Sequence, residues 1–310
     1  MILLVGATGM LGSAIARRLI QEGTEFRALV RPGTDASAPE RAGVPLFRGD
    51  IREPASLVAA ATGVETVIST ANVIARALGG KTDLTIRDVD LRGNANLVRA
   101  ADDAGVQRFV FLSFQNAVLD SGTPFAEAKR ATEQRLSASR MREVIVRPDM
   151  FQEVWLSPLV QFDWPNRSVT IFGKGDARHR YVAVDDVAQA VVRWAVASDP
   201  PREIEFGGPE AMTRKEAADA FERALATKIK RRHVPRVALR LGSAALRQIR
   251  PPLASVMGQA LAADLGDSKA DDAPLRELGI EPRAVSRYIE EVVATAVAAH
   301  IDRRGRTHLS

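Results

Sequence analysis

Short apolar runs alternate with amphipathic segments through the first half of the chain. The apolar runs have the length of buried strands, and they occupy residues 2–5, 26–30, 46–47, 66–69, 109–113 and 144–147. Between them, apolar positions recur with helical spacing over 11–21, 54–61, 84–104 and 125–138. This alternation is typical of a parallel sheet covered by helices on both faces. We therefore expect an α/β fold with a doubly wound parallel sheet, whose ligand crevice lies outside the carboxyl ends of the strands.

The pattern becomes less regular beyond residue 148. Residues 169–182 predict a β-hairpin around a glycine turn. Asp185 and Asp186 are placed to cap a helix, a strand is expected over 203–206, and Thr213 with Glu216 predicts a capping box. We expect residues 1–150, completed by about 182–206, to form the main domain. Residues 151–181 and 207–300 would form a smaller, mostly helical lobe, followed by a disordered tail at 301–310.

The loop after the first expected strand carries three glycines. It reads Gly6-Ala7-Thr8-Gly9-Met10-Leu11-Gly12 and leads directly into a helical pattern. Glycines at this spacing let the backbone turn tightly, approach a pyrophosphate and pack the helix against the strand, so that the helix N-terminus faces the anion. The strand before the loop and the helix after it are the context that this mechanism requires. The sequence therefore predicts a dinucleotide-binding Rossmann fold, with cofactor contacts from Gly6, Thr8, Gly9, Met10, Leu11 and Gly12.

The loops after the next strands predict the rest of the cofactor site. Arg31 follows the second strand, at the position where an acidic residue would bind the ribose 2′-hydroxyl of NAD. A guanidinium suits a 2′-phosphate instead, so Arg31 favours NADP(H). The alternative is that Arg31 is a surface residue before a turn. Asp50, which precedes Ile51, contacts the adenine amino group or bonds its own backbone in a turn. The loop Thr70-Ala71-Asn72 follows the fourth strand, and we expect its backbone to contact the cofactor.

Composition narrows the class of protein. The chain has 310 residues, 46% of them apolar and 26% charged, as expected for a globular protein with one large and one smaller unit. It has no cysteine, which excludes disulfides and thiolate chemistry, and its four histidines lack the spacing of metal ligands, so no metal is expected. Because a strand begins at the N-terminus and no apolar run reaches about 20 residues, we expect a cytoplasmic protein without a signal peptide or membrane span.

Charge is unevenly distributed along the chain. The formal net charge is +5, but residues 228–250 contain eight basic residues and no acidic residue. One interpretation is a basic amphipathic helix over 237–249 that contacts an anionic membrane surface or an acidic partner; the favoured one is the solvated face of a peripheral helix. Because no aromatic residues or known motif accompany this charge, binding to nucleic acid is not expected.

Several motifs together resemble the short-chain dehydrogenase/reductase superfamily, in particular its atypical NmrA-like, isoflavone-reductase-like branch. They are the glycine loop 6–12, Val30-Arg31, Gly49-Asp50, the segment 93–113, Lys129, Arg147-Pro148 and the run 181–188. The resemblance covers most of the chain. It implies an NADPH-binding domain with a C-terminal substrate lobe and, in many members, reduction of enones, quinones or related small molecules.

The chain departs from the superfamily pattern at the catalytic position. Many members carry Tyr-x-x-x-Lys, in which the tyrosine donates a proton, whereas this chain has Phe125 four residues before Lys129. The isoflavone-reductase-like branch is similar in lacking the tyrosine and using a lysine as acid/base, so the resemblance implies that Lys129 serves catalysis and contacts the cofactor. Tyr181 offers another hydroxyl, although a packing role is favoured for it. Asp90 stands where the superfamily often has asparagine.

Other candidates lie at the expected catalytic crevice. Ser113 ends the fifth strand and either hydrogen-bonds a substrate carbonyl or satisfies a structural group, with Gln115 and Asn116 as alternative donors. His179 lies near the expected substrate side. Apolar candidates for the substrate lining come from the second lobe: Phe151, Trp155, Phe162 and Trp164.

These features favour an NADPH-dependent reductase. Hydride would pass to a small apolar enone, quinone or carbonyl substrate, and Lys129 or a water would supply a proton. The alternative is a catalytically silent NADP(H)-binding regulatory or assembly protein of the NmrA-like type. Neither the substrate nor the oligomeric state follows from the sequence.

Overall fold

A seven-stranded parallel sheet forms the centre of the main domain. A computed structural model describes residues 1–307 of the protein. The strands are β1 (Ile2–Val5), β2 (Phe26–Val30), β3 (Leu46–Arg48), β4 (Thr66–Ser69), β5 (Arg108–Leu112), β6 (Arg142–Pro148) and β10 (Glu203–Phe206). They lie in the order β10-β6-β5-β4-β1-β2-β3, and every neighbouring pair is parallel. The predicted doubly wound fold is confirmed.

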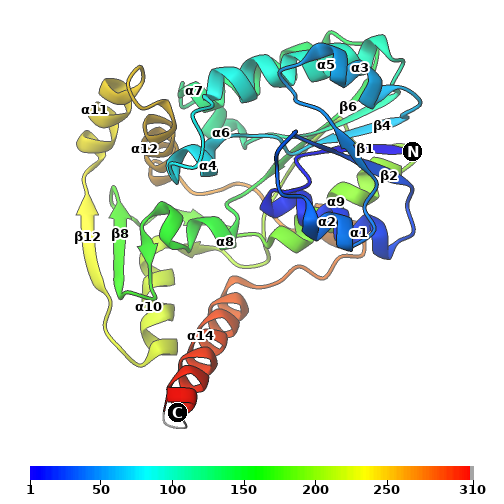
Figure 1. Ribbon diagram of the computed structural model, residues 1–310. Coiled ribbons are helices and arrows are strands. Elements are labelled where there is room, and N and C mark those ends of the chain that lie inside the picture. The colour runs from blue at the N-terminus through cyan, green and yellow to red at the C-terminus, as the bar shows by residue number, and fades with distance from the viewer. Residues whose placement is uncertain (308–310) are drawn as a thin grey trace.

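Helices cover both faces of this sheet, as Figure 1 shows. Alternate strand residues point to opposite faces, so Ile2 and Leu4 join one apolar core while Leu3 and Val5 join the other. The first core is closed by α1 (Met10–Gln21), α9 (Val184–Val196) and the short α13 (Ala273–Glu277), which contributes Leu275. The short α2 (Ser37–Arg41) follows Ala36 of this core. The second is closed by α3 (Pro54–Ala61), α5 (Asn94–Asp103) and α7 (Pro124–Ser137).

The helix expected over 84–104 is divided in two. Its first part, Arg87–Gly93, is a π-helical segment labelled η1, and α5 follows it directly. Gly93 permits close packing at the junction, since a Cβ there would lie 2.8 Å from Cγ2 of Ile51. Such segments are rare and recur at functional sites, and this one places Asp90 in the protein interior.

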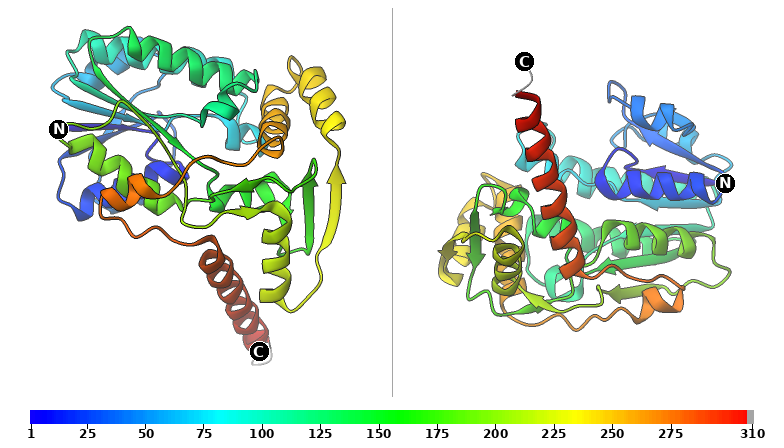
Figure 2. Two further views of the ribbon diagram at one scale, coloured as in Figure 1. Left: turned by 180° about the vertical axis from the view of Figure 1, so that it is seen from behind. Right: turned by 90° about the horizontal axis from the view of Figure 1, so that it is seen from below.

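The remaining elements gather beyond the carboxyl ends of the strands. A three-stranded sheet is formed by β7 (Phe162–Asp163), β8 (Ser168–Phe172) and β12 (Lys230–Val234), and β9 (Arg178–His179) pairs with β11 (Met212–Thr213). The longer helices here are α10 (Arg214–Leu225), α11 (Arg236–Leu246), α12 (Pro251–Asp264) and α14 (Val285–Thr307), whose far end projects from the molecule (Figure 2). Shorter helices here are α4 (Ile74–Leu78), α6 (Asn116–Leu119), α8 (Gln152–Trp155) and η2 (Pro158–Val160).

The predicted hairpin over 169–182 is not formed. Strand β8 pairs with β7 and β12, whereas β9 pairs with β11 in another sheet. Gly173 and Gly175 have positive φ values of 62° and 68°, but their loop is closed by a distant carboxylate rather than by a hairpin ladder. Asp264 accepts the backbone N–H groups of Lys174 at 2.8 Å and Gly175 at 2.6 Å.

Of the two capping predictions, one is confirmed and one is wrong. Thr213 and Glu216 form the expected capping box at the start of α10. The proposed capping of α9 by Asp185 and Asp186 is wrong, because the Glu153 carboxylate accepts the Val184 N–H at 3.1 Å and takes that role. At the C-terminus, the expected tail at 301–310 is helical as far as Thr307, and residues 308–310 lie outside the described part.

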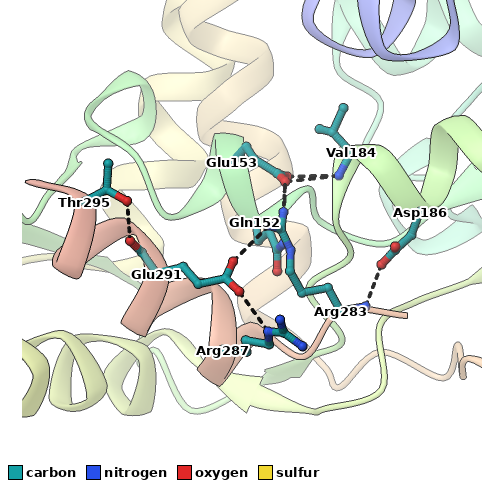
Figure 3. Close-up of polar contacts among 8 residues, drawn as sticks. All are labelled: Gln152, Glu153, Val184, Asp186, Arg283, Arg287, Glu291 and Thr295. Atoms are coloured by element: carbon teal, nitrogen blue, oxygen red, sulfur yellow. Dashed lines mark hydrogen bonds and ion pairs between the residues drawn. The ribbon is translucent and has the colours of Figure 1, made fainter. Parts of the chain in front are cut away.

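Arg283 connects the segment before α14 to the main domain, as Figure 3 shows. Its Nη2 lies 2.9 Å from Glu153 Oε1, and its backbone N–H donates to Asp186 Oδ2 at 2.8 Å. Its Nη1 lies 3.3 Å from Glu291 Oε2 of α14. A single residue therefore holds α8, α9 and α14 together.

Candidate active site

A cavity of about 450 Å³ lies at the carboxyl ends of β1, β2, β4, β5 and β6. This is the edge at which doubly wound sheets bind their ligands. Its lining includes every residue that the sequence predicted for the dinucleotide, together with the two leading catalytic candidates, Ser113 and Lys129: Gly6, Thr8, Gly9, Met10, Leu11, Gly12, Arg31, Asp50, Ile51, Thr70, Ala71 and Asn72.

The glycine loop is built by close backbone packing. Gly6 has a φ of +94°, and a Cβ there would lie 2.4 Å from Oγ1 of Thr70. A Cβ on Gly12 would lie 2.0 Å from the Gly6 carbonyl oxygen, so only glycine lets α1 approach β1 this closely. Gly9 is the N-cap residue of α1, and among the described residues no side chain caps this helix. The first N–H groups of α1 are thus left for an anion in the cavity.

Arg31 and Asp50 lie on the cavity wall with different surroundings. Within the described chain, the Arg31 guanidinium makes no hydrogen bond or ion pair, which suits it to an incoming phosphate. Asp50 forms the expected turn, since its Oδ1 accepts the Arg52 N–H at 2.9 Å. The Arg52 side chain lies 2.7 Å from Oδ2, and this hydrogen-bonded pairing lowers the pKa of Asp50. The structure thus shows the turn interpretation of Asp50, and both carboxylate oxygens are already engaged.

Lys129 extends from α7 into an aromatic enclosure. Its side chain is 4% exposed, and Nζ lies 4.5 Å from the ring centre of Phe111 and 5.5 Å from that of Phe125. Nζ donates a hydrogen bond of 2.6 Å to the Leu112 carbonyl oxygen. Burial lowers the pKa of Lys129, while the charges of Asp90 and Glu133 oppose that shift. A lysine in this setting gives up its proton more readily than one in water.

Asp90 is the second ionisable group beside Lys129. It is 1% exposed; Oδ2 accepts the Val73 N–H at 3.3 Å, and Oδ1 has no hydrogen-bond partner among the described residues. Burial raises the pKa of Asp90, and the charge of Lys129 partly opposes this. Two buried groups with oppositely displaced pKa values are typical of sites that handle protons. The sequence singled out Asp90 only as a departure from the superfamily pattern.

The Ser113 hydroxyl belongs to a buried polar network. Its Oγ donates to Glu133 Oε1 at 2.5 Å, and Glu133 pairs with Arg147 at 3.0 Å. The single Ser113 proton is therefore engaged, although Ser113 lines the cavity. The alternatives Gln115 and Asn116 do not line the cavity.

Two other candidates lie away from the cavity lining. Tyr181 is 1% exposed, and burial raises its pKa to about 12, so it acts as the packing aromatic and not as a replacement for the missing tyrosine. His179 Nε2 lies 2.9 Å from the Ala263 carbonyl oxygen, which makes it a structural residue.

The second lobe contributes part of the predicted apolar wall and part that was not predicted. Phe151 and Trp155 line the cavity. Phe162 is buried in the lobe's own core, and Trp164 stacks on Phe221 at a centroid distance of 5.1 Å, so neither contributes to the wall. Among the lining residues that the sequence did not predict are those from α4 and α12: Ile74, Ala75, Arg76, Leu78, Val256 and Gln259. The Pro251-Pro252 start of α12 marks a helix, but nothing local shows where that helix packs.

Among the side chains that the structure describes, no group of three or more His, Cys, Asp or Glu is arranged to hold a metal ion. In the described part of the chain, no helix is long and apolar enough to span a membrane.

The chain is similar in sequence and in fold to proteins that are already known. A profile described as NAD(P)H-binding matches residues 6–198. The NAD(P)H azoreductase of Xenophilus azovorans is 30% identical over 72% of this chain and 73% of its own length. The photosystem II assembly factor Ycf39 of Synechocystis is 32% identical over 62% of this chain, but the matched part is only 57% of that protein. An NADPH-dependent quinone oxidoreductase of Escherichia coli, solved with NADPH, superposes with a TM-score of 0.74 at 22% identity, over 94% of this chain and 99% of that structure.

Proposed function

Because the chain belongs to the NAD(P)H-binding family, we propose that it is an NADPH-dependent reductase of small, apolar enone, quinone or carbonyl substrates. The observation that carries this proposal is the position of Lys129, a buried cation on the wall of the cavity that the glycine loop also lines. Dinucleotide site and proton donor thus share one enclosed space.

The chain's own residues divide the work. The glycine loop and the N-terminus of α1 hold the pyrophosphate, and Arg31 holds the 2′-phosphate. When bound, the reduced dinucleotide supplies a hydride. The Lys129 ammonium supplies a proton to the substrate oxygen, and its lowered pKa eases that transfer. The Leu112 carbonyl oxygen keeps Nζ in place.

The substrate class follows from the remaining wall. Phe114, Phe125, Phe151 and Trp155 line the cavity, so an apolar and preferably aromatic substrate fits best. The similarity to an azoreductase over nearly three quarters of both chains supports a reduction of this kind.

The alternative is a catalytically silent NADP(H)-binding assembly or regulatory protein. It is favoured by Phe125, which cannot donate a proton, and by the Ser113 hydroxyl, which is engaged by Glu133. The similarity to an assembly factor points in the same direction, although the chain matches just over half of that relative's length.

Turnover by a Lys129→Met variant separates these functions. NADPH oxidation would be followed with a naphthoquinone and an azo dye, alongside NADPH binding by nicotinamide fluorescence. We expect Lys129→Met to bind NADPH and to lose about 10²- to 10⁴-fold in kcat. Lys228→Met is the matched control, because Lys228 is 94% exposed. Unchanged turnover in Lys129→Met would remove Lys129 from the mechanism, and a wild-type protein that binds NADPH but reduces neither substrate would favour the silent alternative.

A further inference from the structure

Helix α11 presents an apolar face to solvent. Val237 is 67% exposed and Leu241 is 64% exposed, and Ile249, just after the helix, is 76% exposed. With the exposed Ala245, these residues recur at helical spacing; we call them the α11 stripe. The opposite side of α11 is well packed, since Leu239 is 1% exposed and Ser243 Oγ donates to the Ala254 carbonyl oxygen of α12 at 2.8 Å. The stripe is therefore a feature of a fixed helix.

The basic residues around the stripe fall into two groups. Four are held by acidic partners: Lys228 by Glu222, Arg231 by Asp219, Arg236 by Asp264 and Arg247 by Glu127. The others are exposed and form no ion pair with any side chain that the structure describes: Lys230, Arg232, Arg240 and Arg250. Residues 228–250 contain no acidic residue, so these four unpaired side chains leave an excess of positive charge beside the stripe.

We propose that the α11 stripe and its unpaired basic residues are a docking surface for an anionic lipid bilayer. A helix that exposes apolar side chains among basic ones inserts the former at the headgroup boundary while the latter contact lipid phosphates. The helix lies at the outer edge of the molecule (Figure 1), where it can approach a flat bilayer surface. A second copy of this chain is a poor occupant, because pairing two such surfaces would oppose like charges.

Docking at α11 would place the cavity close to the bilayer. Gly242 of α11 lies against Met257 of α12, where a Cβ would be 2.1 Å from the Met257 Cε. Val256 and Gln259 of the same α12 line the cavity. One helix thus separates the lipid-facing surface from the substrate space, an arrangement suited to apolar molecules that partition into lipid.

Vesicle flotation tests the surface without requiring turnover. The full chain would be mixed with vesicles of phosphatidylcholine alone or of phosphatidylcholine with phosphatidylglycerol, at low and high salt. We expect binding only to the anionic vesicles and weaker binding at high salt. Leu241→Asp combined with Ile249→Asp should weaken binding more than tenfold, and Arg240→Gln with Arg250→Gln by roughly 25-fold, since each basic residue near the surface contributes about fivefold. Both pairs are exposed, so the fold should persist, as NADPH binding or thermal unfolding would verify.

Matched controls show whether the effect is local. Arg17→Gln with Arg99→Gln removes the same charge from exposed positions on α1 and α5, and Val196→Asp changes a 57% exposed apolar residue of α9. These variants should bind as the wild type does. The proposal is overturned if the wild type fails to bind anionic vesicles at low salt, or if the controls weaken binding as much as the α11 variants. It is also overturned if light scattering shows a dimer that Leu241→Asp dissociates, because the stripe would then belong to a second copy.

Discussion

Arg31 and Lys129 are cations in one cavity with different physical roles. Lys129 is enclosed by aromatic rings, and within the described residues it makes no direct ion pair with Asp90, so its charge is costly to keep. Protein cores seldom retain a lysine of this kind without a chemical use for it. Arg31 is partly exposed and lines the cavity, and its guanidinium makes no hydrogen bond or ion pair with the residues that the structure describes. The first residue suits proton transfer and the second suits recognition of a phosphate.

An Arg31→Glu variant tests this recognition. The substitution removes a charge-assisted contact to the 2′-phosphate and supplies an acid for the 2′-hydroxyl, so NADPH affinity should fall about 10- to 100-fold while NADH affinity holds or rises. Titration with each dinucleotide, followed by nicotinamide fluorescence, measures both changes. Arg17→Glu introduces the same charge on the exposed side of α1 and should leave the preference intact. Parallel losses for the two cofactors would show that Arg31 does not read the phosphate.

Site residues could be predicted from the sequence where the neighbouring residues alone indicate their position. The glycine loop and Arg31 are recognised because each directly follows a strand, and parallel strands bring such loops to one edge. Phe162 and Trp164 were expected in the substrate wall on aromatic character alone, yet they pack against Phe221, about 60 residues later in the chain. The proton of Ser113 is likewise taken by Glu133, whose direction no local pattern reveals.

At the scale of elements, the strands and helices of the sheet were predictable because their hydrophobic period is set by burial. The failures lie where a distant group decides local structure. Two glycines between apolar runs normally indicate a hairpin, but here Asp264 binds their loop and frees β8 to pair elsewhere. The start of α9 is satisfied in the same way by Glu153 of α8. In both cases a carboxylate from another element binds backbone N–H groups, and the local sequence gives no sign of that contact.

Gly12→Ala tests the packing of β1 against α1. The added Cβ would lie 2.0 Å from the Gly6 carbonyl oxygen, so the helix must move away and carry its N-terminal N–H groups with it. We expect a loss of about 1–3 kcal/mol in the free energy of unfolding and an NADPH affinity at least tenfold lower. Urea unfolding and fluorescence titration measure these effects. Gly266→Ala is the control, since a Cβ there meets nothing within 4 Å; equal behaviour of the two variants would contradict the tight-packing account.

At the scale of the whole molecule, the walls of the cavity come from two parts of the chain. Phe151 and Val154 near α8 and Val184 of α9 form part of its wall. Their elements are fixed by Glu153, Asp186 and Arg283, the cluster of Figure 3. Burial raises the pKa of Glu153 and raises that of Asp186 to about 6. The connection between the parts is therefore built from carboxylates that are costly to ionise.

This cost predicts how stability varies with pH. The pKa of Asp186 rises from 3.8 to about 6 on folding, so the folded state binds the proton more tightly than the unfolded state. Its contribution to stability is then complete below pH 4 and is lost as the pH rises to 6, by up to about 3 kcal/mol.

Asp186→Asn removes this titration, while its side-chain oxygen still accepts the Arg283 N–H. We expect the variant to gain stability relative to the wild type as the pH rises from about 4 to about 7, measured by urea unfolding at each pH. Asp103→Asn, at an exposed position ending α5, should follow the wild type. If the stability of Asp186→Asn varies with pH as that of the wild type does, the ionisation of Asp186 does not cause the pH dependence.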